Sequence, residues 1–164
     1  MPYIMLQSSE PTAAPLQQPH APPSTISAEI VSPTLYPMQL SMPLPLSPHT
    51  TLHLQITPLA TSSLTFITTT DPSTSSSLSA LGSFVYSMPN RFQPFEPLST
   101  PLYAVPGSID FATRVAKILA RRTGKPAYVG CSAVFGNYGI EEEMAGVRAV
   151  VDGVMGVLDE GEKD

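Results

Sequence analysis

Residue types that mark whole classes of protein are scarce in this chain of 164 residues. Its single cysteine, Cys131, rules out an internal disulfide framework and fits a reducing compartment. Its three histidines form no cluster, so the three or four converging ligands of a metal site are lacking. No apolar run reaches the roughly 18–20 residues that a membrane-spanning helix needs. We therefore expect no metal, no cofactor and no membrane segment.

Charge is also scarce and unevenly placed. Lys, Arg, Asp and Glu make up 13% of the chain, and the net charge of −5 argues against binding to nucleic acid or anionic membranes. None of the eight Lys and Arg residues precedes Arg91. The N-terminus thus lacks the basic region of a secretory signal and the arginines of a mitochondrial presequence. We expect a cytoplasmic protein, with the nucleus as a second compartment.

Proline marks the first part of the chain, because eleven of the 19 prolines fall within residues 1–48. Each proline removes a backbone donor and biases the preceding residue toward extended geometry. We expect residues 1–48 to be a disordered segment with polyproline II character, followed by a folded domain at residues 49–160. Residues 42–46 (MPLPL) are either a ligand for a proline-binding module or part of a solvated tail.

The clearest local pattern is a helix, a stop and a strand within residues 107–132. Ser108 suits the N-cap, and Asp110 places a carboxylate in the first turn. Gly124 fits the position after the helix, and Pro126 prevents its continuation into the short strand that follows. The apolar face of this helix recurs at helical spacing: Phe111, Ala112, Val115, Ala116, Ile118 and Leu119.

Four further strands are predicted upstream of this helix. Residues 50–58 alternate apolar and polar side chains, and residues 64–68 follow after a short connection that favours an antiparallel hairpin. Residues 78–87 form a third strand, with Gly82 as a candidate bulge. Residues 98–105 form a fourth, which proline interrupts and which we therefore place at an edge.

A second helix is predicted over residues 140–158, with three glutamates in its first turn. Gly146, Gly153 and Gly156 lie inside it, and each costs about 1 kcal/mol relative to alanine. The glycines either permit close packing against the sheet or a partner, or mark a marginal helix that frays after Asp152. Both readings are compatible with the pattern.

The resulting order, β-β-β-β-α-β-α, predicts an α+β domain with a mainly antiparallel sheet and two helices on one face. The other face is left uncovered, and Phe66, Tyr86 and Tyr128 give it an aromatic character. A domain this small with a bare sheet face usually closes it with a partner. We expect a dimer that uses this face.

The sequence contains no catalytic constellation, and we expect a protein that is not an enzyme. No histidine follows Cys131, so a buried small side chain is favoured over a nucleophile. His49 and His53 are four residues apart in an extended segment, which favours solvated side chains over a metal pair. The one concentrated positive patch either docks on an acidic protein surface or is a solvated helix end: Arg121, Arg122 and Lys125.

Residues 111–132 resemble the proteasome assembly chaperone 4 family. The resemblance centres on residues 115–125 (VAKILARRTGK) and 126–130 (PAYVG), a helix that ends in a Leu-Ala-Arg-Arg-Thr run and continues into an aromatic-Val strand. It extends over residues 50–158 and leaves the proline-rich segment outside. It implies a chaperone that forms a heterodimer with proteasome assembly chaperone 3 and helps to build the α-ring of the 20S proteasome.

The same resemblance implies that the pair holds α-subunits, notably α5, and leaves before the particle matures. We take Arg121, Arg122 and Lys125 as the candidate docking patch, and Phe66, Tyr86 and Tyr128 as the candidate heterodimer face.

Two other classes stay open. One is a small dimeric adaptor of longin or roadblock type in trafficking or GTPase regulation, whose helices are placed differently around a five-stranded sheet. The other is a cysteine-dependent enzyme, which requires a titratable group within hydrogen-bond reach of Cys131.

Overall fold

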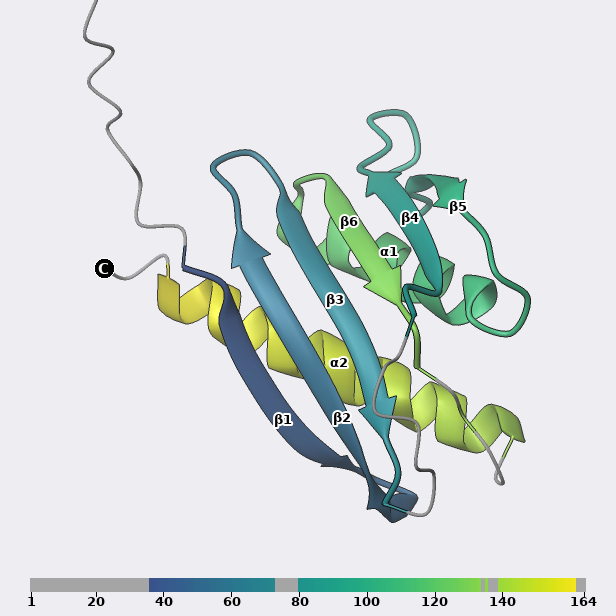
Figure 1. The fold of residues 1–164 in the computed structure, drawn as a ribbon. Helices are drawn as coiled ribbons and strands as arrows, with labels where there is room; N and C mark the ends of the chain where they lie inside the picture. Colours follow the sequence, from purple (N-terminus) through teal and green to yellow (C-terminus); the bar gives the residue numbers. More distant parts are fainter. Residues whose placement is uncertain (1–35, 73–79, 134, 136–138, 162–164) are drawn as a thin grey trace, which may run out of the picture. The chain divides into compact units, whose positions relative to one another are not determined.

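Six strands and two helices make up the part of the chain that the computed structural model describes, residues 36–72, 80–133, 135 and 139–161 (Figure 1). These residues all belong to the unit Ser32–Asp164. The strands are β1 (Met38–Leu44), β2 (Ser47–Pro58), β3 (Ser63–Thr70), β4 (Ser83–Met88), β5 (Leu98–Tyr103) and β6 (Ala127–Cys131). The helices are α1 (Ile109–Thr123) and α2 (Gly139–Gly161).

The strands form one sheet in the order β1-β2-β3-β6-β4-β5. Every neighbouring pair is antiparallel except β3 and β6, which run parallel. Both helices lie on the same face of the sheet, with α2 behind β1 and β2 and α1 behind β6 and β4 (Figure 1). The predicted class, an α+β domain with a mainly antiparallel sheet and two helices on one face, is confirmed.

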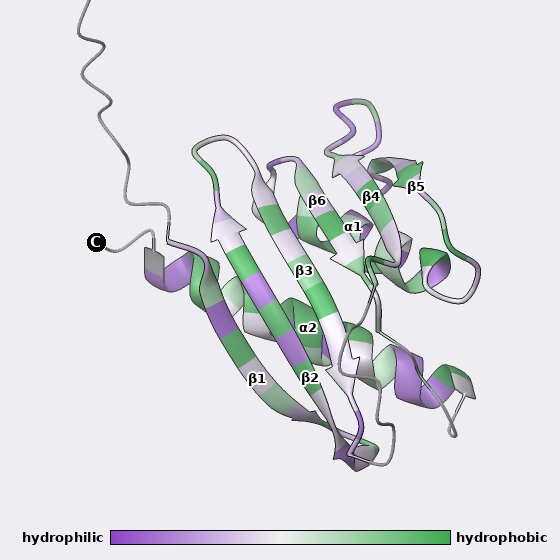
Figure 2. Cartoon of the chain, in the orientation of Figure 1, coloured by the Kyte–Doolittle hydropathy of each residue, from purple (hydrophilic) through white to green (hydrophobic). Residues whose placement is uncertain are grey.

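Alternation along the strands separates the core from the open face. In β2, Leu52, Leu54 and Ile56 are buried against the helices, whereas His53 and Gln55 lie on the other side. The colours along this strand alternate accordingly between hydrophobic and hydrophilic (Figure 2). The same period of two operates in β3 and β4 and over residues 127–129 of β6. The core is completed by α1 and α2, whose buried apolar side chains include Phe111, Val115, Leu119, Val147, Val150, Val151 and Val154.

Strand β1 corrects the expected boundary at residue 48, because it takes residues 38–44 into the sheet. Its pattern is itself alternating: Leu44 is buried, Leu40 and Met42 pack against the core, and Pro43 points outward. An edge strand tolerates a proline, since one side of it needs no ladder partner. Residues 42–44 are therefore unavailable as a free proline-motif ligand. Residues 1–35 lie outside the described part of the chain.

Helix α1 begins and ends where its sequence predicted. Gly124 adopts a left-handed conformation with φ of 64°, and its N–H donates to the Ala120 carbonyl. Ser108 occupies the N-cap position, but its hydroxyl does not cap the helix. It accepts a hydrogen bond from the Ser83 N–H at 3.1 Å instead. The predicted N-cap position is therefore right, but the predicted capping hydrogen bond is wrong. Ser108 instead links the start of α1 to β4.

Helix α2 is continuous to Gly161, so the fraying alternative is wrong. A Cβ at Gly146 would lie 2.8 Å from the Phe135 ring, and one at Gly153 would lie 2.9 Å from Leu40 Cδ2. These two glycines permit close packing against the domain's own loop and sheet. At Gly156 a Cβ would meet nothing within 4 Å, so this glycine has no packing role.

Strand β4 begins at Ser83, later than the predicted 78–87, and residues 73–79 lie outside the described part. Gly82 is not a bulge. A Cβ there would overlap the carbonyl oxygen of Cys131, so glycine lets the chain pass close to the end of β6. The irregularity in the sheet falls instead between Phe84 and Val85, opposite β5. Strand β5 lies at the edge, as expected.

Candidate docking surfaces

The open face of the sheet carries four aromatic rings in one row of contacts. Phe66 of β3 stacks on Phe84 of β4 with ring centroids 6.2 Å apart, and Phe84 stacks on Tyr128 of β6 at 6.3 Å. Tyr128 in turn lies 4.8 Å from Tyr86. The structure therefore brings Phe66, Tyr86 and Tyr128 together on one face, as the alternation predicted. We call these four residues the aromatic cluster.

Phe84 is the member that sequence reasoning missed. It stands two residues before Tyr86, so the period of two already placed it on the same face. Its ring bridges Phe66 and Tyr128, because it stacks on both of them. Gly130 leaves room for the Phe66 ring, because a Cβ at this position would lie 2.5 Å from Phe66 Cδ1. The Phe66 ring thus lies close to Gly130, where a larger residue would displace it.

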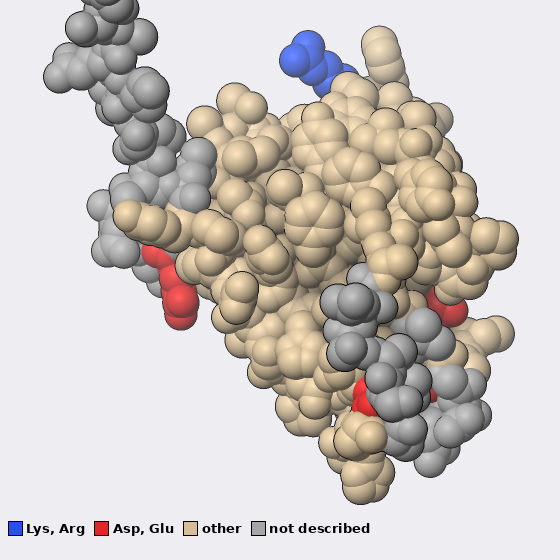
Figure 3. Space-filling model, in the orientation of Figure 1, with Lys and Arg blue, Asp and Glu red and all other residues tan. Residues whose placement is uncertain are grey.

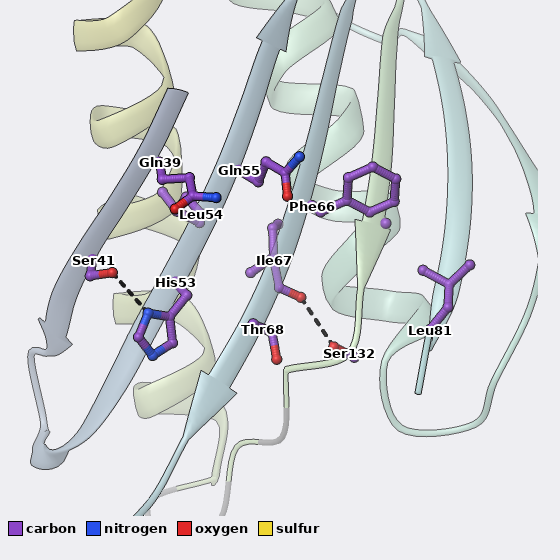
Figure 4. A pocket seen from close by; sticks show the side chains of 11 residues that line it. Gln39, Ser41, His53, Leu54, Gln55, Phe66, Ile67, Thr68, Leu81 and Ser132 are labelled. Atoms are coloured by element: carbon purple, nitrogen blue, oxygen red, sulfur yellow. Dashed lines mark hydrogen bonds between the residues drawn. The ribbon is translucent and has the colours of Figure 1, made fainter. Parts of the chain in front are cut away.

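Beside the aromatic cluster, the face becomes polar without becoming charged. A pocket of about 380 Å³ opens here over β1, β2, β3 and β6 (Figure 4). His53 stands in its floor, hydrogen-bonded through Nδ1 to Ser41 Oγ and through Nε2 to Thr70 Oγ1, both at 2.8 Å. Two hydroxyls thus orient the ring, while His53 is half-buried and both hydrogen bonds lie on the exposed face. Amide and hydroxyl groups of Gln39, Gln55 and Thr68 surround it (Figure 4).

None of the six strands in the described part of the chain contains Lys, Arg, Asp or Glu. In the view onto the open face, charged side chains accordingly appear only around its margin (Figure 3). Solvated sheet faces normally alternate apolar with charged or strongly polar side chains. This face is neutral, with rings in one half and hydrogen-bonding groups in the other. Its chemistry suits contact with protein and argues against a strongly charged partner surface.

The basic patch lies elsewhere, where α1 ends and β6 begins. Arg121, Arg122 and Lys125 are all exposed there. Arg122 Nη1 lies 3.5 Å from Asp152 Oδ1 of α2, an exposed pair of small energetic weight. Within the described part of the chain, neither Arg121 nor Lys125 forms an ion pair. The patch lies at the end of α1, which packs on the opposite side of the sheet from the aromatic cluster, so the two are separate surfaces.

Charge is unevenly distributed between the two ends of the sheet, although Asp152 pairs with Arg122 beside the basic patch and Arg114 pairs with Glu143. At the first, here called the Lys125 end, β6 begins beside the end of β4, since Ala127 pairs with Ser87. At the other, the Glu142 end, β6 stops and α2 starts. Acidic groups gather at the Glu142 end, which holds the starts of both helices: Asp110, Glu141, Glu142 and Glu143.

Two of these glutamates do more than suit the start of a helix. Glu142 is 2% exposed and accepts a hydrogen bond from Ser47 Oγ at 2.5 Å, which ties α2 to the start of β2. Glu143 Oε1 lies 3.0 Å from Arg114 Nη1 and ties α2 to α1. Sequence reasoning saw only the helix-start acids, because the partners are 95 and 29 residues away.

The site chemistry gives no support to a cysteine-dependent enzyme. Cys131 is buried and free, and desolvation raises the pKa of its thiol from 9.0 to about 11. The thiol is thus protonated at neutral pH, and in the described part of the chain no hydrogen bond links its sulfur to a titratable side chain. Within the described residues no three His, Cys, Asp or Glu side chains converge as metal ligands; His20 lies outside them. No helix of the described part is long and apolar enough to cross a membrane.

Comparison with known proteins follows this geometry. A solved chain from a structure described as a novel chaperone complex for yeast 20S proteasome assembly has the same fold, with a TM-score of 0.51 and 17% identity. The match covers 75% of this chain and 95% of that chain. No curated protein sequence gives a significant match. The family model described as proteasome assembly chaperone 4 matches residues 51–133, just over half of the chain. The chain therefore belongs to the proteasome assembly chaperone 4 family.

Proposed function

We propose that this chain, within the proteasome assembly role of its family, is a non-enzymatic chaperone that pairs with proteasome assembly chaperone 3 and helps to assemble the 20S α-ring. The observation that carries the proposal is the open sheet face. Six strands without a charged residue carry four aromatic rings on the side that no helix covers. Such a face is stabilised when a second protein removes it from water.

The partner that fits this face is neutral over the same area. The aromatic cluster calls for apolar side chains opposite it, because aromatic residues supply much of the binding energy of protein interfaces. The polar half of the face, which includes Gln39, Ser41 and Gln55, requires hydrogen-bonding groups on the partner. A charge buried here without a partner costs several kcal/mol. A sheet of similar fold, as the resemblance implies for proteasome assembly chaperone 3, meets these requirements.

We further propose that the basic patch docks on an acidic surface of an α-subunit, notably α5. Arg121 and Lys125 support this because they project from the Lys125 end, apart from the acidic Glu142 end. Complementary charge accelerates encounter and sets orientation more than it adds affinity. The face and the patch would thus bind two proteins at once. We place this activity in the cytoplasm and also in the nucleus.

The adaptor reading loses support from the architecture. It required helices placed differently around a five-stranded sheet. This sheet has six strands, and both helices lie on one face. The family match over residues 51–133 favours the chaperone reading as well.

The heterodimer is tested by co-expression with proteasome assembly chaperone 3 and measurement of mass by size exclusion with light scattering. We expect a 1:1 pair. Tyr86→Glu should abolish it, because the variant places a charge within the aromatic cluster. Gly156→Glu is the matched control, since it adds the same charge at an exposed position of α2 where a Cβ would meet nothing within 4 Å. A well-folded monomer that ignores its partner, or a Tyr86→Glu variant that still pairs, would contradict the proposal.

The docking step is tested on the assembled pair with recombinant α5. Reversing the two exposed cations, Arg121→Glu with Lys125→Glu, should weaken capture of α5 and leave the 1:1 pair intact. Arg148→Glu is the control, because Arg148 is exposed on α2. Capture that survives the double reversal would reject the basic patch as the docking site.

A further inference from the structure

The loop between β4 and β5 exposes two phenylalanines to an unusual degree. Phe92 is 96% exposed and Phe95 is 87% exposed, the highest values among the large apolar side chains of the described residues. Met88 and Leu98, which pair with each other at the base of the loop, are 40% and 54% exposed. A single exposed apolar residue is ordinary, but a contiguous group marks an interaction site. We call residues 89–97 the Phe loop.

The Phe loop is held by its own hydrogen bonds. Asn90 Oδ1 accepts from the N–H of Phe92 at 3.0 Å and from the N–H of Gln93 at 3.3 Å. The Glu96 N–H donates to the Gln93 carbonyl at 2.9 Å, which closes a turn with Pro94 at its second position. The two phenylalanines are therefore presented by a preorganised loop, so little conformational entropy is lost when they bind.

The base of the loop is fixed to the sheet. Ser87 is fully buried, and its hydroxyl donates to the Leu98 carbonyl at 2.9 Å. Pro97 is also buried, although the residues on either side of it are exposed. The exposure of Phe92 and Phe95 thus belongs to a loop that is anchored at both of its ends.

The Phe loop lies at the Lys125 end of the sheet. It leaves β4 next to the start of β6, because Ser87 pairs with Ala127, and the same end appears at the top of Figure 1. Arg91 within the loop is exposed, as are Arg121 in the last turn of α1 and Lys125 on the connection to β6. Against these cations the loop itself carries one acid, Glu96. Two aromatic rings therefore stand beside an excess of positive charge.

We infer that the Phe loop and the basic patch form one composite docking surface, whose occupant is an acidic protein surface with an apolar depression that receives Phe92 and Phe95. The charge excess selects an acidic partner, and the rings supply the desolvated anchor that surface cations lack. This inference rests on the proposed docking to an α-subunit. It names the residues that provide affinity, whereas Arg121 and Lys125 steer the encounter.

The test titrates recombinant α5 against the full-length pair with proteasome assembly chaperone 3. Phe92→Ser with Phe95→Ser should raise the Kd at least about 30-fold, the size expected for hot-spot residues. The control is Ile140→Ser, because Ile140 is 77% exposed but lies at the Glu142 end. Ile140→Ser should leave the Kd within about twofold. The substituted side chains are exposed, so the fold of the pair should be retained.

Salt separates the two contributions. Raising the NaCl concentration should increase the Kd for α5 by the same factor for the wild-type pair and for the pair with the Phe loop variant. The reason is that the cations are present in both. Arg121→Glu with Lys125→Glu should instead remove most of the salt dependence. If the Phe loop variant binds α5 unchanged while the charge variant does not, the composite surface is wrong and the proposed docking stands. If neither variant changes the Kd, both fail. If the Phe loop variant lowers the mass of this chain measured alone, the loop joins copies of it, and the inference is overturned.

Discussion

Substituting Gly82 by alanine should strongly destabilise the domain, because the obstacle is backbone. A Cβ at this position would overlap the carbonyl oxygen of Cys131 and lie 3.0 Å from both the Cys131 carbonyl carbon and Ser108 Oγ. Unlike a flexible side chain, the end of β6 cannot rotate away. The start of β4 must therefore move from β6, which breaks the pairing of Ser83 with Cys131.

The magnitude follows from what this movement disrupts. Ser108 Oγ accepts from the buried Ser83 N–H, and Ser83 Oγ accepts from the Val105 N–H at 2.9 Å. A buried group left without its hydrogen bond costs about 1–3 kcal/mol, and overpacking costs about 1–3 kcal/mol more. We expect Gly82→Ala to lower the free energy of unfolding by about 4 kcal/mol. For a domain of this size that corresponds to a fall in Tm of about 12–20 °C.

Thermal and urea unfolding, followed by far-UV circular dichroism, measure this loss. Gly156→Ala is the matched control, because its Cβ meets nothing within 4 Å. That control should gain up to about 1 kcal/mol from helix propensity. If Gly82→Ala unfolds within about 1 kcal/mol of the wild type, β4 and β6 do not approach as closely as described, and the reasoning is refuted.

Two further predictions concern Cys131 and β1. The pKa of the Cys131 thiol is about 11 in the folded protein and near 9.0 in the unfolded chain. The free energy of unfolding should therefore fall by about 2–3 kcal/mol as the pH rises through this interval. Unfolding measured against pH should lack this component in Cys131→Ala. A chain that starts at residue 45 loses buried Leu44, and it should melt at least about 10 °C below a chain that starts at residue 32.

Sequence alone was most successful where the determinants are local. In α1 the apolar spacing, Gly124 and Pro126 act within a few residues of one another, and the observed helix ends at Thr123. The hairpin of β2 and β3 is also local, and its turn is closed by the Leu59 N–H donating to the Ser62 carbonyl. These elements need no knowledge of the rest of the chain.

The errors occurred where a distant partner decides the outcome. Proline density suggested that residues 38–44 are disordered, but an edge position beside β2 and packing on α2 make them a strand. Ser108 was read as a helix cap, yet its hydroxyl serves β4, 25 residues away. The place of β6 between β3 and β4 is likewise set by long-range pairing. Local composition carries no information on any of these contacts.

The candidate surfaces divide in the same way. Phe66, Tyr86 and Tyr128 were found by their alternation within strands, which puts them on the open face whatever the strand order. That they form a connected cluster depends on the neighbouring β3, β6 and β4 and on Phe84. The sequence predicted strands on either side of the Phe loop, but only a structure reports that its two rings are solvent-exposed on an ordered loop.

The placement of prolines helps to decide how the sheet meets a partner. Both edge strands carry one within their length, Pro43 in β1 and Pro101 in β5. A proline cannot donate to a ladder, so it opposes extension of the sheet by an added strand. The edges are therefore poorly suited to pairing, whereas the face between them is neutral and aromatic. A partner is accordingly expected to pack sheet on sheet, which buries the aromatic cluster and leaves the Lys125 end exposed for a second protein.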